Sequence, residues 1–205
     1  MSHTEGGAES HKRMLRREFL TVRNRLTTDD LRETATLLAA RALELPELAA
    51  ARTVAAYVSV GGEPGTLTLL DALLARGVRV LLPALLPDND LDWGAYTGEG
   101  SLARVRHGGR MTLFEPAGER LGPDAVTDAD VVLLPGLAVD ARGVRLGRGG
   151  GSYDRVLARL ERAGADPSLV VLLYDSEVVE HLEEEPHDRP VDAVVTPSGV
   201  RRLTG

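Results

Sequence analysis

The sequence predicts an α/β fold in three layers, with helices on both faces of a mostly parallel, twisted sheet of the Rossmann-like type. Short apolar runs alternate with helical patterns along the chain, which is typical of strand–helix–strand units. The chain has 205 residues, enough for one domain with a full core, and aromatic residues make up only 3% of it. We therefore expect a single domain whose core is built from aliphatic side chains.

The order of the expected elements follows from apolar periodicity and from turn residues. Residues 11–26 carry apolar positions at helical spacing, and Thr28 is a candidate cap for a second helix over 29–45. Further helices are expected over 66–75, over 153–162 (ending at Gly164) and, briefly, over 176–181. Strands are expected over 54–60, 78–83, 91–96, 131–135, 169–174 and 193–195, with a loop-rich stretch at 97–125.

Composition narrows the function classes. The net charge of -7 argues against a nucleic-acid surface, and the absence of cysteine excludes disulfides, thiolate metal sites and a cysteine nucleophile. No apolar run approaches the roughly 18 residues of a membrane span, and the polar N-terminus has no apolar signal segment. We expect a soluble, cytoplasmic monomer with no nucleic-acid or membrane partner, a disordered tail over residues 1–10 and one domain over 11–205.

A glycine-rich loop is the most informative feature of the chain. The apolar run 131–138 is followed by Gly147, Gly149, Gly150 and Gly151, and a helical pattern starts directly afterwards. A strand, a glycine loop and a helix in this order can offer backbone N–H groups to a phosphate, and the nearby Arg145 and Arg148 supply positive charge. The alternative is a flexible connecting loop, but a turn needs fewer glycines than these.

The better-known phosphate motifs are absent. No G-x-x-x-x-G-K-[ST] occurs, and no G-x-G-x-x-G opens the first strand–helix unit. The loop therefore indicates a phosphate-bearing ligand without naming it. Gly61, Gly62 and Glu63 also follow an expected strand, so both loops should open onto the same edge of the sheet.

Lys12 is the only lysine among the 24 basic residues. A compact ammonium group and a guanidinium differ where a point charge meets a phosphate. Lys12 and Arg16 lie one helical turn apart and can face one ligand. The alternatives are chance for the single lysine and a solvated basic face for the helix.

These motifs, in this order, resemble the 5-formyltetrahydrofolate cyclo-ligases, also called methenyltetrahydrofolate synthetases. The resemblance runs from about Lys12 to Pro197. The residues that carry it are Lys12 to Arg16, Gly61 to Glu63, Leu82-Pro83, Phe114-Glu115-Pro116, Leu134-Pro135-Gly136 with Asp140 and Gly143, Arg145 to Arg155, His187-Asp188, Val191-Asp192 and Thr196-Pro197.

The resemblance implies a fold of the cyclo-ligase type and the ATP- and Mg²⁺-dependent cyclisation of 5-formyltetrahydrofolate to 5,10-methenyltetrahydrofolate. ADP and phosphate would be released after phosphorylation of the formyl oxygen. Such a reaction depends on positioning and charge neutralisation more than on a protein nucleophile.

Residue roles are implied at the matched positions. The residues implied to contact ATP are Lys12, Arg13, Met14, Leu15, Arg16, Arg145, Leu146, Gly147, Arg148, Gly149, Gly150, Gly151, Ser152 and Tyr153. The residues implied to contact the folate are Val58, Glu63 and Arg148 to Ser152. Arg148 and Tyr153 are the implied catalytic residues, and Asp154 and Asp188 are the implied Mg²⁺ ligands. The simpler alternatives are a helix-dipole acid for Asp154, a turn residue for Asp188 and an exposed loop acid for Glu63.

Two departures from the family pattern fall on the folate side. Ser152 stands where the family usually has a first tyrosine, and Pro64-Gly65 replaces a pair that often includes an acid. They leave two other functions open. One is a family member that uses ATP on a different formylated or carboxylated substrate, and the other is a non-catalytic nucleotide- or folate-binding regulator.

Overall fold

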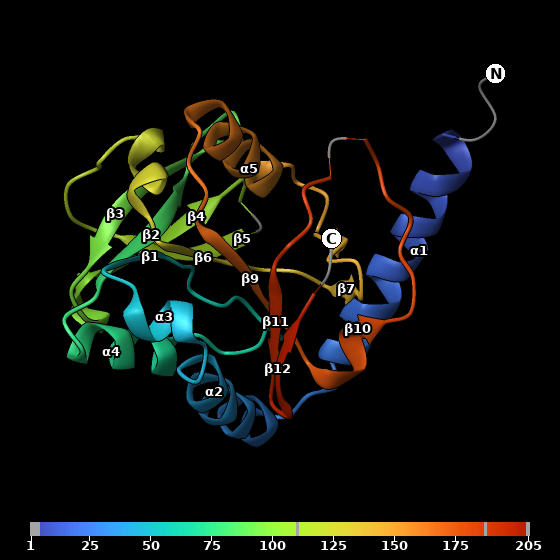
Figure 1. The fold of residues 1–205 in the computed structure, drawn as a ribbon, viewed down its shortest axis with the longest axis horizontal. Helices are drawn as coiled ribbons and strands as arrows, with labels where there is room; N and C mark the ends of the chain where they lie inside the picture. Colours follow the sequence, from blue (N-terminus) through green and yellow to red (C-terminus); the bar gives the residue numbers. More distant parts are fainter. Residues whose placement is uncertain (1–4, 110, 187, 204–205) are drawn as a thin grey trace.

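The computed structural model describes residues 5–109, 111–186 and 188–203, and a seven-stranded sheet forms its centre (Figure 1). The spatial order of the strands is β12 (Gly199–Arg202), β11 (Ala193–Thr196), β9 (Ser168–Leu172), β6 (Val131–Leu134), β1 (Thr53–Ala55), β2 (Arg79–Leu85) and β3 (Leu91–Tyr96). The five inner strands are parallel, while β12 and β3 pair antiparallel at the two edges. The mostly parallel sheet of the predicted fold class is thus confirmed.

The helices are α1 (Glu5–Arg23), α2 (Thr28–Ala42), α3 (Pro46–Ala50), α4 (Leu67–Ala75) and α5 (Ser152–Ala163), with 3-10 turns η1 (Glu99–Ser101), η2 (Pro123–Asp128) and η3 (Asp175–Glu177). A small sheet contains β10 (Val178–Val179), β7 (Ala138–Asp140) and β8 (Arg145–Leu146), and a hairpin pairs β4 (Leu102–His107) with β5 (Met111–Pro116).

Alternate side chains of the sheet build two separate cores, one on each face. Val54 and Leu133 pack with apolar residues of α2, α3 and α4, whereas Ala55 and Leu134 pack with α5 and η2. Successive residues of a strand point to opposite faces, so continuous apolar runs such as 131–134 serve both cores. This is the three-layer arrangement with helices on both faces.

Helix α1 covers neither face of the main sheet. Its apolar residues Leu15, Phe19 and Leu20 pack on a third cluster, formed by the small sheet and by Leu182. Figure 1 shows α1 beside β7 and β10, apart from the other helices. The rest of its docking surface is polar, and it includes the buried Lys12 and Arg23.

The order of the strands creates a switch point between β1 and β6. From β1 the chain proceeds to β2 on one side, and later returns to β6 on the other side of β1. The loops that leave the carboxyl ends of two such neighbouring strands diverge, which opens a crevice for ligands. The loop after β1 contains Glu63, and the segment after β6 leads to the glycine loop.

Several expected elements differ in the structure. The helix expected over 176–181 is wrong: η3 and the short strand β10 occupy that stretch, because Val178 and Val179 pair with β7. The loop-rich stretch contains the β4–β5 hairpin. Thr27, and not Thr28, caps α2, since its side chain accepts a hydrogen bond from the Asp30 N–H in a capping box.

The N-terminal helix also begins earlier than residue 11. Residues 5–10 belong to α1, and Glu9 forms an ion pair with Arg16 two turns later, with 3.2 Å between Oε1 and Nη1. The disordered tail expected over 1–10 is therefore helical from residue 5, and residues 1–4 lie outside the described part.

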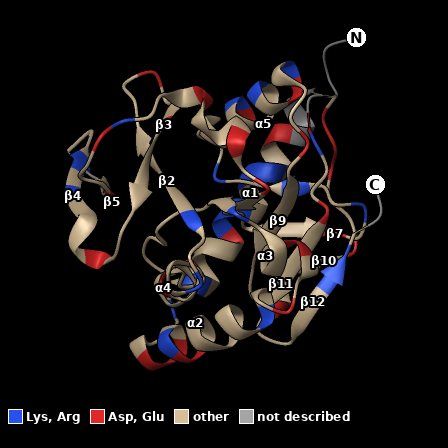
Figure 2. Cartoon of the chain, turned by 60° about the vertical axis from the view of Figure 1, so that its left-hand side comes forward, with Lys and Arg blue, Asp and Glu red and all other residues tan. Residues whose placement is uncertain are grey.

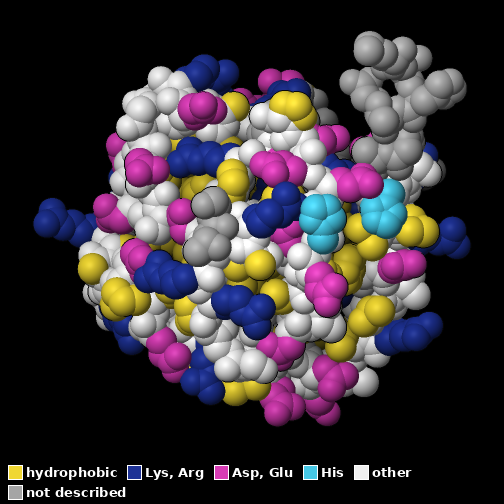
Figure 3. All heavy atoms as spheres, turned by 45° about the vertical axis from the view of Figure 1, so that its right-hand side comes forward, with side chains coloured by type: hydrophobic (Ala, Val, Ile, Leu, Met, Phe, Trp, Pro, Cys, Tyr) yellow, Lys and Arg dark blue, Asp and Glu magenta, His cyan; other side chains and the backbone are white. Residues whose placement is uncertain are grey.

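Charged side chains of both signs are distributed over the helices and loops and occur on the edge strand β12, whereas the central strands β11, β9, β6 and β1 carry none (Figure 2). One face of the molecule shows basic and acidic groups interspersed rather than gathered into a patch of one sign (Figure 3). In the part of the chain that the structure describes, none of the helices has the length and apolarity needed to cross a membrane.

Candidate functional site

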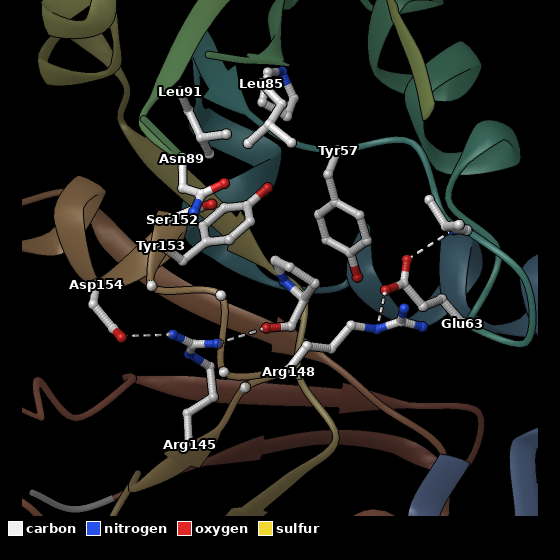
Figure 4. A pocket seen from close by; sticks show the side chains of 18 of the residues that line it. Tyr57, Glu63, Leu85, Asn89, Leu91, Arg145, Arg148, Ser152, Tyr153 and Asp154 are labelled. Carbon is white, nitrogen blue, oxygen red and sulfur yellow. Dashed lines mark hydrogen bonds and ion pairs between the residues drawn. The ribbon is translucent and has the colours of Figure 1, made fainter. Parts of the chain in front are cut away.

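A cleft of about 320 Å³ lies at the switch point, at the carboxyl ends of β1 and β6. Its wall combines segments from α1, the loop after β1, the β2–β3 turn, the β4–β5 hairpin, the glycine loop and the segment before β11. Figure 4 shows labelled side chains from the loop after β1, the β2–β3 turn, the glycine loop and the start of α5 around one space. The volume is within the range of small-molecule sites, which starts at about 300 Å³.

The glycine loop forms one side of the cleft and leads directly into α5. Gly149 and Gly151 have positive φ values of 88° and 77°, which a residue with a Cβ adopts only at a cost. Gly151 is also the N-cap residue of α5. The first N–H groups of a helix have no partner within it, so the start of α5 presents backbone donors and the positive end of its dipole to the cleft.

Arg145 is buried beneath this loop. One of its terminal nitrogens donates to the Pro135 carbonyl over 2.9 Å, and the other lies 3.6 Å from a carboxylate oxygen of Asp154. Its Nε is buried and makes no hydrogen bond to a described residue. Burial lowers the pKa of the guanidinium, and the nearby Asp154 and Asp188 oppose that shift. The guanidinium of Arg145 is thus held under the glycine loop, where a bound anion can neutralise its charge.

Helix α1 contributes two cations to the same side. The Nε of Arg16 donates to the Gly147 carbonyl over 3.0 Å, which ties the helix to the glycine loop. Lys12 is only 7% exposed, and its Nζ lies 3.1 Å from Glu185 and 3.6 Å from Asp188. The burial of Lys12 contradicts the alternative of a solvated basic face at this position.

Glu63 lines the cleft from the loop after β1. One of its carboxylate oxygens accepts from the Val60 N–H over 2.8 Å, and the other lies 3.3 Å from Nε of Arg148. Burial raises the pKa of Glu63, while the charge of Arg148 and the hydrogen bond from Val60 oppose that rise. Glu63 is 8% exposed, so the alternative of an exposed loop acid is wrong.

Asp154 and Asp188 face the cleft from the first turn of α5 and from the segment before β11. Asp154 pairs with Arg145, while Asp188 pairs with Lys12 and accepts from the Glu185 N–H over 2.8 Å. Among the residues that the structure describes, no three His, Cys, Asp or Glu side chains lie together as a metal cage. Two carboxylates suit Mg²⁺ bound together with phosphate oxygens, because Mg²⁺ usually takes only one or two carboxylate ligands from the protein and the others from phosphate and water.

The remaining wall is largely apolar and aromatic. Tyr57 and Val58 line it from the loop after β1, Tyr153 lines it from the first turn of α5, and Met111, Leu113 and Phe114 line it from the hairpin. Burial raises the pKa of both tyrosines above the usual value, so each presents a neutral hydroxyl at neutral pH. Met111 and Phe114 are 40% and 46% exposed, which is unusual for side chains of this size.

Most of the residues expected in a site meet in this cleft. They are Lys12, Arg16, Val58, Glu63, Arg145, Leu146, Gly147, Arg148, Gly149, Gly150, Gly151, Ser152, Tyr153, Asp154 and Asp188. Arg13 and Met14 are exposed and Leu15 packs in the third cluster, so these three line other surfaces, and their contact with ATP stays a prediction. His187, quoted with the motif set, lies outside the described residues.

Sequence reasoning missed several residues of the wall, among them Tyr57, Asn89, Leu91, Met111, Phe114 and Glu185. Tyr57 directly precedes Val58, so the same strand end could have indicated it. Asn89 has a positive φ of 65° in the turn before β3. Phe114 was quoted with the motif set but given no role in the site, and Met111 gave no signal, because the stretch was expected to be loop-rich.

Comparison with known proteins identifies the family. The model of the 5-formyltetrahydrofolate cyclo-ligase family matches residues 8–197. The 5-formyltetrahydrofolate cyclo-ligase of Mycolicibacterium smegmatis is 43% identical over 151 residues, which cover 71% of this chain and 74% of that protein. The enzyme of the same name from Escherichia coli is 34% identical over 180 residues, covering 87% and 96%.

A solved structure agrees with this result. The NMR structure of the 5,10-methenyltetrahydrofolate synthetase of Aquifex aeolicus superposes with a TM-score of 0.77 at 30% identity. The superposition covers 95% of this chain and 93% of that one. Sequence and fold therefore lead to the same family.

Proposed function

This chain belongs to the 5-formyltetrahydrofolate cyclo-ligase family, and from that membership we propose that it converts 5-formyltetrahydrofolate to 5,10-methenyltetrahydrofolate with ATP and Mg²⁺. The observation that carries the proposal is the contact between Glu63 and Arg148, 3.3 Å apart. It brings the acid suited to a pterin and the glycine loop suited to a triphosphate to one point of one cleft.

ATP is assigned to the side of the glycine loop. The donors at the start of α5 and the positive charges of Lys12, Arg16 and Arg145 suit its phosphates. The Nε of Arg145 has no hydrogen-bond partner among the described residues, which supports this assignment, since a buried donor left unpaired is costly unless a ligand accepts from it.

The reduced folate is assigned to the other side. Glu63 can accept from the N–H edge of a pterin, and Val58, Tyr57 and Phe114 offer apolar surface to its rings. Arg148 extends from the glycine loop to Glu63, so it can reach both ligands.

The chemistry proposed for this arrangement has two steps. The formyl oxygen first takes the γ-phosphoryl group, and ADP leaves. N10 then attacks the activated formyl carbon, the carbon–oxygen bond breaks, and phosphate departs with the proton that N10 gives up. Arg148 would neutralise charge on the oxygens between the two ligands, and the neutral Tyr153 hydroxyl can donate to one of them. Asp154 and Asp188 would hold Mg²⁺, which neutralises phosphate charge when bound.

A second candidate function rests on Ser152. A serine at the first position of α5 gives no aromatic surface where the family usually has a tyrosine, and Ser152 lines the cleft. A different formylated or carboxylated substrate is therefore the alternative. The Pro64-Gly65 change has a structural reason of its own, because a Cβ at position 65 would lie 2.7 Å from that of Ala35 in α2.

The test is a spectroscopic assay of the purified protein with 5-formyltetrahydrofolate, ATP and Mg²⁺. We expect the methenyl absorbance to grow only when all three are present, with equimolar phosphate release. Equal conversion after EDTA treatment or without nucleotide contradicts the proposed reaction. Phosphate release that ignores the folate but responds to another formylated compound favours the alternative, and no phosphate release under any condition favours a binding protein.

A further inference from the structure

A buried cluster lies behind the folate side of the cleft and outside its wall. It contains Arg23 at the end of α1, Tyr174 after β9 and Glu177 in η3. Arg23 and Glu177 are each only 2% exposed. None of the three lines the cleft, yet two of them bind carbonyls of the loops that form it.

Arg23 binds two segments at once. Its Nε and one terminal nitrogen donate to the two carboxylate oxygens of Glu177 over 2.7 and 2.9 Å. The same terminal nitrogen donates to the Gly136 carbonyl over 2.7 Å. Gly136 lines the cleft directly after β6, so the guanidinium joins α1 and η3 to the cleft wall.

Tyr174 extends the cluster to the loop after β1. Its ring lies beneath the Arg23 guanidinium, 5.6 Å from the carbon to the ring centroid. Its hydroxyl donates to the Gly62 carbonyl over 2.9 Å. Its own N–H donates to Glu177 over 3.0 Å, which closes the cluster on itself.

Gly62 has no room to shift toward α1. A Cβ at this position would lie 2.9 Å from the carbonyl oxygen of Arg23 and 3.0 Å from its Cβ. Glu63 follows directly, and its carboxylate closes a short ring with the Val60 N–H. The place of the acid in the cleft therefore depends on where the Gly62 carbonyl is held.

From these contacts we propose that Arg23, Tyr174 and Glu177 form a positioning unit that fixes the place of Glu63 in the cleft by holding the Gly62 carbonyl, and that the bond from Arg23 to the Gly136 carbonyl anchors this unit to the cleft wall. The proposal rests on the function proposed above for the Glu63 side. Stability alone explains the cluster poorly, because a buried ion pair often contributes no more than apolar packing of similar size. What apolar side chains cannot do is bind two loop carbonyls in fixed directions.

The position of Arg23 on its helix supports this role. Lys12, Arg16 and Arg23 are spaced by four and by seven residues, which places all three on one face of α1. The first two contact the ATP side, and the third binds the Gly136 carbonyl and lies over the ring of Tyr174, whose hydroxyl holds the loop of Glu63. One rigid helix thus links the two halves of the cleft.

Tyr174→Phe is the sharpest variant, since it removes only the hydrogen bond to Gly62 and keeps the ring under Arg23. Tyr96→Phe is the matched control: its hydroxyl donates to Asp71 over 2.6 Å, and Tyr96 does not line the cleft. We expect Tyr174→Phe to raise KM for the folate about fivefold, the size of one lost hydrogen bond, with kcat and KM for ATP nearly unchanged. Tyr96→Phe should leave all three constants unchanged.

Hydrogen exchange gives a readout that needs no activity. The amides of Val60 and Glu63 should exchange faster in Tyr174→Phe than in the wild type and in Tyr96→Phe. Arg23→Lys should show the same pattern more strongly, because one ammonium cannot reproduce three directed hydrogen bonds.

The two proposals fail separately. Unchanged exchange at 60–63 together with an unchanged folate KM in Tyr174→Phe overturns the positioning unit. A wild-type protein that does not act on 5-formyltetrahydrofolate overturns the proposed function, and the exchange comparison then decides the positioning unit alone. If Tyr174→Phe and Tyr96→Phe raise KM for the folate and speed exchange at 60–63 equally, the positioning unit is also overturned, since a general loss of stability would explain both variants.

Discussion

Arg148 and Glu63 form an ion pair across the cleft, with Nε of the arginine 3.3 Å from Oε1 of the glutamate. The pair joins the glycine loop to the loop after β1, two segments 85 positions apart in the sequence. Burial raises the pKa of Glu63 above its ordinary value of 4.5, and Arg148 is the largest influence that opposes the rise. The ionisation of the acid is therefore coupled to the position of the arginine.

The first prediction concerns the pH dependence of folate binding. In the proposed function the ionised Glu63 accepts from the pterin, so we expect folate affinity to be lost as pH falls through the pKa of Glu63. In Arg148→Gln the opposing charge is gone and that pKa rises further, so affinity should be lost at a higher pH than in the wild type. Equilibrium dialysis of 5-formyltetrahydrofolate at a series of acidic pH values measures this shift.

Arg155→Gln is the control for that experiment. Arg155 is exposed on α5, and its ion pair with Asp88 at 3.7 Å lies outside the cleft. In Arg155→Gln, folate affinity should fall at the same acidic pH as in the wild type. If affinity in Arg148→Gln also falls at the wild-type pH, Glu63 does not control folate binding.

The second prediction concerns the acids proposed for Mg²⁺. Asp154→Asn and Asp188→Asn should each raise the Mg²⁺ concentration needed for half-maximal activity and lower the turnover rate, because a neutral amide is a weaker ligand for a hard cation. The fold should survive, since both acids lie at loop or helix ends. Titration of activity with Mg²⁺ is the measurement, and Asp166→Asn, at an exposed ion pair with Arg189, is the control. Wild-type Mg²⁺ dependence in both variants would mean that neither acid binds the metal.

The third prediction concerns Lys12. Its ammonium is buried between Glu185 and Asp188, where the wider guanidinium has little room. Lys12→Arg should weaken ATP use about tenfold, or about 1.4 kcal/mol, the size of one charge-assisted hydrogen bond. Arg17→Lys is the control, because Arg17 is exposed on the same helix. If KM for ATP is the same in Lys12→Arg and the wild type, the single lysine has no special role in ATP binding.

The fourth prediction separates the fold of the glycine loop from its ligand. A Cβ at Gly150 meets no described atom within 4 Å, and the φ of Gly150 is not positive. Gly150→Ala should therefore leave stability nearly unchanged but raise KM for ATP, since the methyl group would occupy the space that phosphate approaches. Gly164→Ala should do the opposite: its φ is 65°, so a side chain costs about 1 kcal/mol, but it caps the far end of α5. An unchanged KM for ATP in Gly150→Ala would argue against phosphate at this loop.

Much of the fold could be predicted because its signals are local. The run at 131–134 is apolar at every position, as a strand buried on both faces must be, and the glycines after it mark the start of α5. The meeting of the Glu63 loop with the glycine loop was also predictable, since parallel strands bring their carboxyl ends to one edge. The cleft confirms that expectation.

The β4–β5 hairpin could not be predicted, because its stability comes from distant partners. Its strands alternate weakly, and the pairing depends on the buried Glu115, which accepts from His107 within the hairpin and from the Leu85 N–H at the end of β2. Arg23 was hidden for a related reason. It is one of several arginines in a basic helix, and only the tertiary contacts distinguish the buried one from its exposed neighbours.

The attachment of α1 outside the two main cores has a thermodynamic consequence. The helix is held by the small third cluster and by polar contacts, yet it carries Lys12 and Arg16. On the proposed role of these cations, ATP would use them only while the helix is docked, so its apparent dissociation constant would equal the intrinsic one divided by the docked fraction. Any substitution that loosens this helix, however far from the nucleotide, therefore weakens ATP binding in proportion, and a saturating nucleotide holds the N-terminus of the domain in place.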